Sequence, residues 1–157
     1  MNYPENYTRQ LQTLLRLVED SSEGYKTAAE HASSQEFIEL FRGFAAEREM
    51  LAEELRERIA RYGVHAEEPG SDFMASLHRS WMGIKTAMTK KDDQAVLESC
   101  RNGDQSVLDA YDDMMQGDLL NDTDMKTFLS GQRYTINRAF MDLDKRYFDL
   151  FKKDPSI

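Results

Sequence analysis

The chain has 157 residues, of which 40% are apolar and 31% are charged, and this composition predicts one globular domain over residues 1–157. Its formal net charge of −9 argues against nucleic acid or an anionic membrane as a partner, because such a surface repels phosphate groups. A lone cysteine, Cys100, excludes an intramolecular disulfide, and the chain shows neither a secretory signal nor a long apolar run, so we expect a cytoplasmic protein.

Two long segments in the first half of the chain, 4–32 and 34–62, carry apolar residues at helical spacing. Ser33 lies three residues before Glu36, which is the spacing of a capping box, and Gly63 predicts the end of the second helix. The first apolar stripe consists of Tyr7, Leu11, Leu14, Val18, Tyr25 and Ala28. The second consists of Phe37, Phe41, Phe44, Arg48, Leu51, Leu55 and Ile59.

After a linker with the sequence VHAEEPGS, a shorter helix is predicted over 71–89, with Met74, Leu77, Trp81, Ile84 and Met88 on its stripe. Two more long helices are predicted over 92–116 and 121–152. Asp92 caps the first of these and Gly117 ends it, and Asn121 or Asp122 caps the second. Their stripes are Leu97, Cys100, Asp104, Val107, Tyr111 and Met114, and then Met125, Leu129, Gln132, Ile136, Ala139, Leu143 and Leu150.

These helices predict an all-α fold, because no segment alternates as a strand does. Short connections join the first long helix to the second and the third to the fourth, whereas a long connection separates the two pairs. This pattern favours a ferritin-like four-helix bundle of two hairpins, with the short extra helix in the crossover. The alternative is an up-down-up-down bundle with the fifth helix packed elsewhere.

Each long helix interrupts its apolar stripe once with polar residues, and in antiparallel hairpins these interruptions fall near mid-bundle. We expect a buried polar layer formed by Ser21, Ser22, Arg48, Asp104 and Gln132. A guanidinium in an apolar core requires an anion, so Arg48 should pair with Asp104. The alternative is that Arg48 lies at the edge of its stripe and extends its head group to water. Hydroxyls that could bond to the layer belong to Tyr25, Tyr111 and Tyr147.

Ferritin-like carboxylate proteins hold metal ions at this height, using glutamates and Glu-x-x-His motifs. No acidic residue of this chain is followed by histidine three residues later, so we expect neither a complete di-iron site nor another cofactor. A weaker alternative is a divalent-metal site built from Glu19, Glu23, Glu30 and Glu47, which otherwise form solvated helix faces. Cys100 has no histidine near it in sequence and is expected in the core.

Three stretches, DSSEGYKTAAE, GSDFMASLHRSWMGIK and CRNGDQSVLDAY, together resemble a bacterial family of ferritin-like four-helix-bundle proteins of unknown function. The resemblance implies the ferritin-like fold and carries no activity with it. Some members have acidic residues where this chain has Arg101 and Asn102, which weakens a metal site further. In the second stretch, Trp81 should pack the crossover helix onto the bundle, while His78 and Arg79 make an anchoring hydrogen bond or bind a small anion.

Two functional hypotheses follow from these features. The first is a non-enzymatic bundle protein that acts by binding or in the response to stress. Such a protein could form a homodimer through an exposed helix face. The second is a ferritin-like protein with an atypical site for iron, manganese or zinc. The missing Glu-x-x-His motifs favour the first. A third and weaker hypothesis places an anion at Arg48.

Overall fold

The computed structural model describes residues 3–63, 70–72, 74–75, 79, 86, 92–117 and 121–152. Within these ranges the long elements are four α-helices, α1 (Tyr3–His31), α2 (Gln35–Tyr62), α4 (Asp93–Gln116) and α5 (Thr123–Tyr147), and a short π-helix, η2 (Phe148–Lys152), continues α5. Of the short helix predicted over 71–89, the structure describes residues 71–72, 74–75, 79 and 86, which are helical, and the rest of the prediction lies outside the described residues. None of the described helices is long and apolar enough to cross a membrane.

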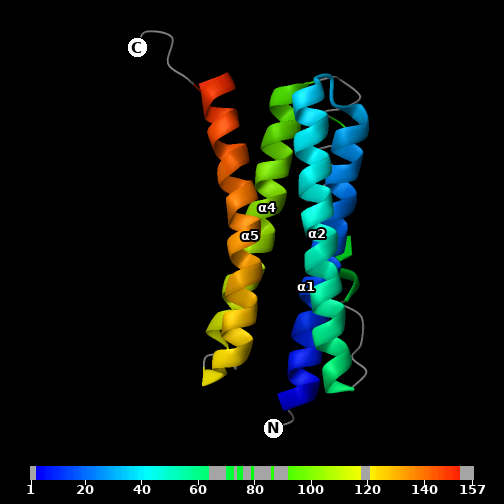
Figure 1. Cartoon of the computed structure of the whole chain (residues 1–157), viewed down its shortest axis with the longest axis vertical. Coiled ribbons are helices and arrows are strands. Elements are labelled where there is room, and N and C mark those ends of the chain that lie inside the picture. Colours follow the sequence, from blue (N-terminus) through cyan, green and yellow to red (C-terminus); the bar gives the residue numbers. More distant parts are fainter. Residues whose placement is uncertain are drawn as a thin grey trace.

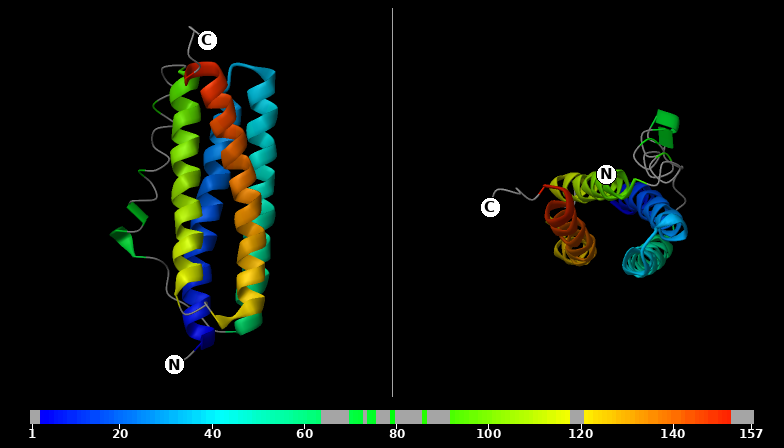
Figure 2. Two further views of the ribbon diagram at one scale, coloured as in Figure 1. Left: turned by 90° about the vertical axis from the view of Figure 1, so that its left-hand side faces the viewer. Right: turned by 90° about the horizontal axis from the view of Figure 1, so that it is seen from above.

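The four long helices lie side by side as a bundle of two hairpins (Figure 1). The helices α1 and α2 form one antiparallel hairpin, and α4 and α5 form the other. The helix α4 begins at the end of the bundle opposite to the end where α2 stops, so α1 and α5 run in one direction and α2 and α4 in the other. Seen end-on in Figure 2, the helices follow an arc with α4 and α1 in the middle and α5 and α2 at its ends.

Local sequence signals determine where the helices begin and end. The side chains of Asp92 and Asp122 accept hydrogen bonds from the backbone amides of the third residues after them, at 3.1 and 3.0 Å, which confirms both N-caps. Gly63 ends α2 with a φ of +63°, a conformation that favours glycine. The predicted capping box is wrong, because Ser34 rather than Ser33 caps α2 through the backbone amide of Phe37.

The core lies where the apolar stripes of the long helices meet, and it includes Leu11, Val18, Tyr25, Leu55, Val107, Tyr111 and Leu129. One stripe prediction is wrong: Leu150 is exposed. The chain changes from α-helix to π-helix after Tyr147, and the extra residue in each π turn rotates the following side chains. Tyr147 and Phe151 therefore face the bundle, with ring centroids 5.7 Å apart.

A buried charged network at the centre of the bundle

The centre of the bundle holds an ion pair between Arg48 of α2 and Asp104 of α4. Both side chains are 0% exposed. Arg48 Nη1 lies 2.7 Å from Asp104 Oδ1, and Nη2 lies 2.9 Å from Oδ2, so the guanidinium engages the carboxylate through two parallel hydrogen bonds. The structure therefore places Arg48 inside the core rather than at its edge.

The helix α1 completes the surroundings of this pair. Tyr25 donates a hydrogen bond of 2.7 Å from its hydroxyl to Asp104 Oδ2, and its ring lies 5.2 Å from the Arg48 guanidinium carbon. Ser21 Oγ accepts a hydrogen bond of 3.2 Å from Arg48 Nη1, and Ser22 Oγ donates one of 3.1 Å to the backbone oxygen of Ala45. Three helices thus supply groups to one network, which fixes their relative heights.

Gln132 of α5 forms a second network beside the ion pair. Its Oε1 accepts a hydrogen bond of 2.6 Å from the hydroxyl of Tyr111, and its Nε2 donates to the backbone oxygen of Leu51 and to Glu54 Oε1, both at 3.1 Å. The role of Glu54 was not predicted from the sequence. The one feature of the sequence that could have indicated it is its position one helical turn after Leu51, which places both residues on the side of α2 that meets α5. The Tyr147 hydroxyl accepts a hydrogen bond from Gln94, which is not part of the expected layer.

Four groups in and around the network, Arg48, Tyr25, Tyr111 and Cys100, have raised pKa values and are held in their protonated states. Burial alone would lower the pKa of Arg48, but the charge of Asp104, its hydrogen bond to Arg48 and the nearby Tyr25 and Tyr111 together raise the pKa. Burial raises the pKa of the Tyr25 hydroxyl and of the Cys100 thiol, and the negative charge of Asp104 raises both further. Burial likewise raises the pKa of Tyr111. Cys100 is fully buried and acts as a core residue rather than as a nucleophile.

These raised pKa values predict that the protein loses stability at alkaline pH. A group whose pKa is higher in the folded state contributes its full stabilisation below the unfolded-state pKa, about 8.5 for cysteine and 10 for tyrosine. Above that pH, each group should lower the free energy of unfolding by up to about 1.4 kcal/mol per pH unit. Cys100→Ala should remove the loss of stability that begins near about pH 8.5, where the thiol of the unfolded chain ionises. Urea unfolding at a series of pH values from neutral to alkaline measures this loss. An unchanged pH profile in this variant would contradict the assignment.

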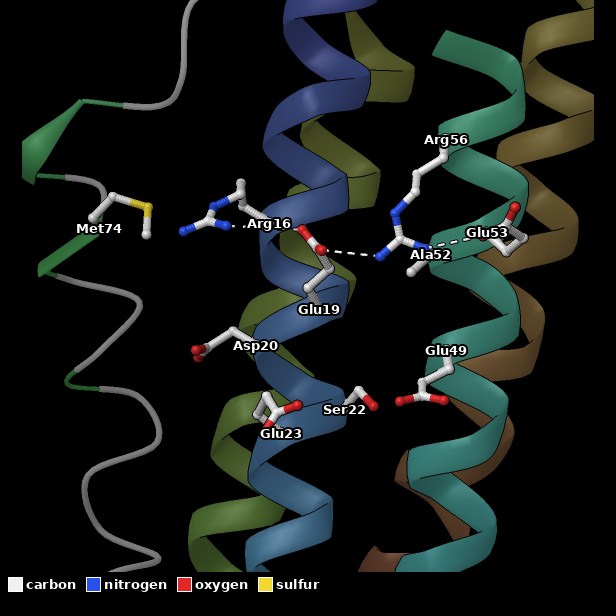
Figure 3. Close-up of a pocket in the computed structure, with 10 residues that line it drawn as sticks. All are labelled: Arg16, Glu19, Asp20, Ser22, Glu23, Glu49, Ala52, Glu53, Arg56 and Met74. Atoms are coloured by element: carbon white, nitrogen blue, oxygen red, sulfur yellow. Dashed lines mark hydrogen bonds and ion pairs between the residues drawn. The ribbon is translucent and has the colours of Figure 1, made fainter. Parts of the chain in front are cut away.

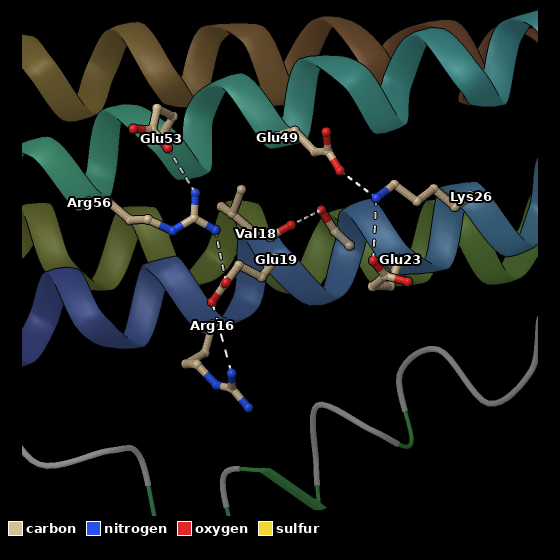
Figure 4. Close-up of polar contacts among 9 residues, drawn as sticks. Arg16, Val18, Glu19, Glu23, Lys26, Glu49, Glu53 and Arg56 are labelled. Atoms are coloured by element: carbon tan, nitrogen blue, oxygen red, sulfur yellow. Dashed lines mark hydrogen bonds and ion pairs between the residues drawn. The ribbon is translucent and has the colours of Figure 1, made fainter.

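A second polar feature is a groove of about 560 Å³ on the outer side of α1 and α2 (Figure 3). Four of its five carboxylates, those of Glu19, Glu23, Glu49 and Glu53, are paired with cations. Arg56 lies 3.0 Å from Glu19 and 3.1 Å from Glu53, and Lys26 bridges Glu23 and Glu49 (Figure 4). Most carboxylates of the groove are therefore engaged in surface ion pairs and are not a set of free cation ligands.

The four glutamates of the weaker metal hypothesis do not converge. Glu19 and Glu23 line the groove between α1 and α2, Glu47 lines a different groove beside α5, and Glu30 is exposed near the end of α1. The rise along a helix separates Glu19 from Glu30 by about 16 Å. Across the part of the chain that the structure describes, no group of three or more His, Cys, Asp or Glu residues could hold a metal ion.

The remaining residues singled out by the sequence are placed as follows. His78 and Trp81 lie outside the described residues, and Arg79 is exposed. Arg101 forms an ion pair with Asp144 of α5 at 2.5 Å and stacks on the ring of Tyr147, whereas Asn102 is exposed. Arg101 thus joins α4 to α5 at the surface and does not contribute to the central network.

Comparison with known proteins gives a family and no function. No curated protein and no solved structure matches the chain. A family model described as a domain of unknown function, DUF2383, matches residues 6–117, which span nearly all of α1 and the whole of α2 and α4. The chain therefore belongs to the DUF2383 family.

Proposed function

We propose that this chain is a ferritin-like bundle protein without a metal centre, and that it acts by binding rather than by catalysis. The order of helix directions, with two hairpins and a long crossover between them, supports the ferritin-like arrangement. The observation that carries the proposal is the fully buried, two-bonded ion pair between Arg48 and Asp104. It occupies the mid-bundle position where ferritin-like carboxylate proteins hold metal ions.

The chemistry of the network opposes a bound cation. The guanidinium of Arg48 repels positive charge, and both oxygens of Asp104 already accept hydrogen bonds. The neighbouring groups are a protonated phenol and a carboxamide, which are poor ligands for a hard cation beside oxygen-rich alternatives. The groups with raised pKa values also stay protonated at neutral pH, so none of them is suited to act as a general base there.

Metal analysis tests this proposal. Protein purified without chelator should contain far less than one equivalent of iron, manganese or zinc per chain. Adding each metal should leave the thermal midpoint the same as in a chelator-treated control, since a ligand that binds the folded state raises that midpoint. A content of about two ions per chain, as in ferritin-like carboxylate proteins, together with a raised midpoint, would overturn the proposal.

A further inference from the structure

Large exposed apolar side chains occur on two of the four long helices and on η2. Among the described residues, the large apolar side chains that are more than half exposed all lie on α2, α5 or η2: Met50 (69%), Tyr134 (64%), Met141 (61%), Phe148 (58%) and Leu150 (57%). Tyr134, Met141 and Phe148 follow one another at intervals of seven residues, so they form a line along the outer side of α5. The helices α2 and α5 are the two ends of the arc seen in Figure 2.

Contacts between α2 and α5 fix their relative heights. Arg146 pairs with Glu36, Gln132 bonds to Leu51, and Arg58 pairs with Asp124. These antiparallel contacts keep the same register along both helices. The register brings further residues to nearly equal heights, in the pairs Glu39 and Lys145, Gly43 and Met141, Glu47 and Arg138, and Met50 and Tyr134. We refer to these residues, together with Gly131, as the α2–α5 face.

The α2–α5 face combines long exposed side chains with glycines that leave open space. Met50 and Met141 are exposed, whereas a Cβ atom added at Gly43 or Gly131 would meet no atom within 4 Å. Gly131 and Met50 also line a groove of about 450 Å³ between the two helices. Each helix therefore presents a long apolar side chain at about the height of an open glycine on the other helix.

The charges of the α2–α5 face separate by helix. Within the described part of the chain, Glu39 and Glu47 of α2 have no cation at ion-pair distance, and Arg138 and Lys145 of α5 have no carboxylate at that distance. The guanidinium carbon of Arg138 lies 6.0 Å from the centroid of the Tyr134 ring. One edge of the face is thus negative and the other positive, and both have unsatisfied pairing capacity.

We propose that the α2–α5 face binds a second copy of this chain about a two-fold axis parallel to the helices. This axis keeps every height and places α2 of one copy against α5 of the other, so that the negative edge meets the positive edge. Met50 then faces the partner's Tyr134 and Gly131, and Met141 faces the partner's Gly43. Glu47 faces the partner's Arg138, and Glu39 faces the partner's Lys145.

The features of the face favour this occupant over an anionic membrane. The line of apolar side chains is one residue wide, as in a helix–helix seam, and the net charge of −9 repels anionic lipid. The inference uses only the α2–α5 face, so it does not rest on the absence of a metal centre. Metal analysis and the test below therefore fail independently of each other.

Sedimentation equilibrium of the full chain tests the proposal. The unmodified protein should be dimeric at micromolar concentration, and Met141→Glu should raise the dimer dissociation constant about 100-fold, because it buries a charge opposite an apolar recess. Asn102→Glu on the exposed side of α4 adds the same charge and should leave the constant unchanged. Circular dichroism melting checks that both variants are folded. A monomer at every concentration, or equal constants for the two variants, would overturn the proposal.

Charge reversal tests the arrangement of the two copies. Glu47→Arg and Arg138→Glu should each weaken the dimer about tenfold or more, because each places like charges opposite one another. An equimolar mixture of the two variants should recover dimers, since both contacts of the mixed pair are then between opposite charges. Loss of dimers in each variant without recovery in the mixture would overturn the proposed axis.

Discussion

Replacing Arg48 with methionine is expected to lower the free energy of unfolding by about 3–5 kcal/mol. Methionine fills much of the space of the arginine stem but leaves the Asp104 carboxylate buried without its counter-ion. The hydroxyl of Tyr25 then remains as a hydrogen-bond donor to a carboxylate with no exposed surface. Urea unfolding followed by circular dichroism at neutral pH measures the change.

A matched control exists on the surface of the same bundle. Arg133 and Asp112 also form two hydrogen bonds between guanidinium and carboxylate, at 2.7 and 3.1 Å, but their side chains are 32% and 40% exposed. Water can solvate what remains after Arg133→Met, so this variant should lose no more than about 1 kcal/mol. Losses of similar size in the two variants would show that burial does not set the contribution of the central pair.

Replacing Tyr25 with phenylalanine should cost about 2 kcal/mol. The variant keeps the ring and its packing against Phe41 and Phe44. It removes only the hydroxyl, which donates a hydrogen bond of 2.7 Å to Asp104. A hydrogen bond to a charged acceptor contributes about 1.5–3 kcal/mol, more than a bond between neutral groups. The same unfolding measurement reports the loss.

Tyr111 provides the internal comparison. Its hydroxyl donates to the neutral carboxamide of Gln132, so Tyr111→Phe should cost only about 1 kcal/mol. The predicted order, with the larger loss at Tyr25, depends on the charge of the acceptor. The opposite order would indicate that the Asp104 carboxylate does not depend on the Tyr25 hydroxyl.

Helical periodicity predicted the long helices and the elements of the core because burial in a bundle repeats every three to four residues. The same periodicity identified the polar interruptions: the structure buries Ser21, Ser22, Arg48, Asp104 and Gln132. Whether Arg48 reached an anion or water could not be decided from its own helix. That outcome depends on the height of α4 relative to α2, which only the packing of the hairpins sets.

Other features depend on geometry that periodicity does not contain. The π turn after Tyr147 shifts the stripe by one residue, and so Phe151 rather than Leu150 faces the bundle. Both serines are chemically suitable as N-caps, so the choice of Ser34 over Ser33 depends on the path of the chain between the end of α1 and the start of α2. The hydrogen bond between Gln132 and Glu54 depends on the contact between α2 and α5, far apart in sequence.

A double-mutant cycle on Arg48 and Asp104 is the most direct test of the central ion pair. It compares the unfolding free energies of Arg48→Met, Asp104→Leu and the double variant with that of the unmodified protein. Because each single change strands a buried charge and the double change strands neither, the double variant should be more stable than the summed losses predict, by at least about 2 kcal/mol. Losses that simply add would contradict a guanidinium and a carboxylate held together in the core.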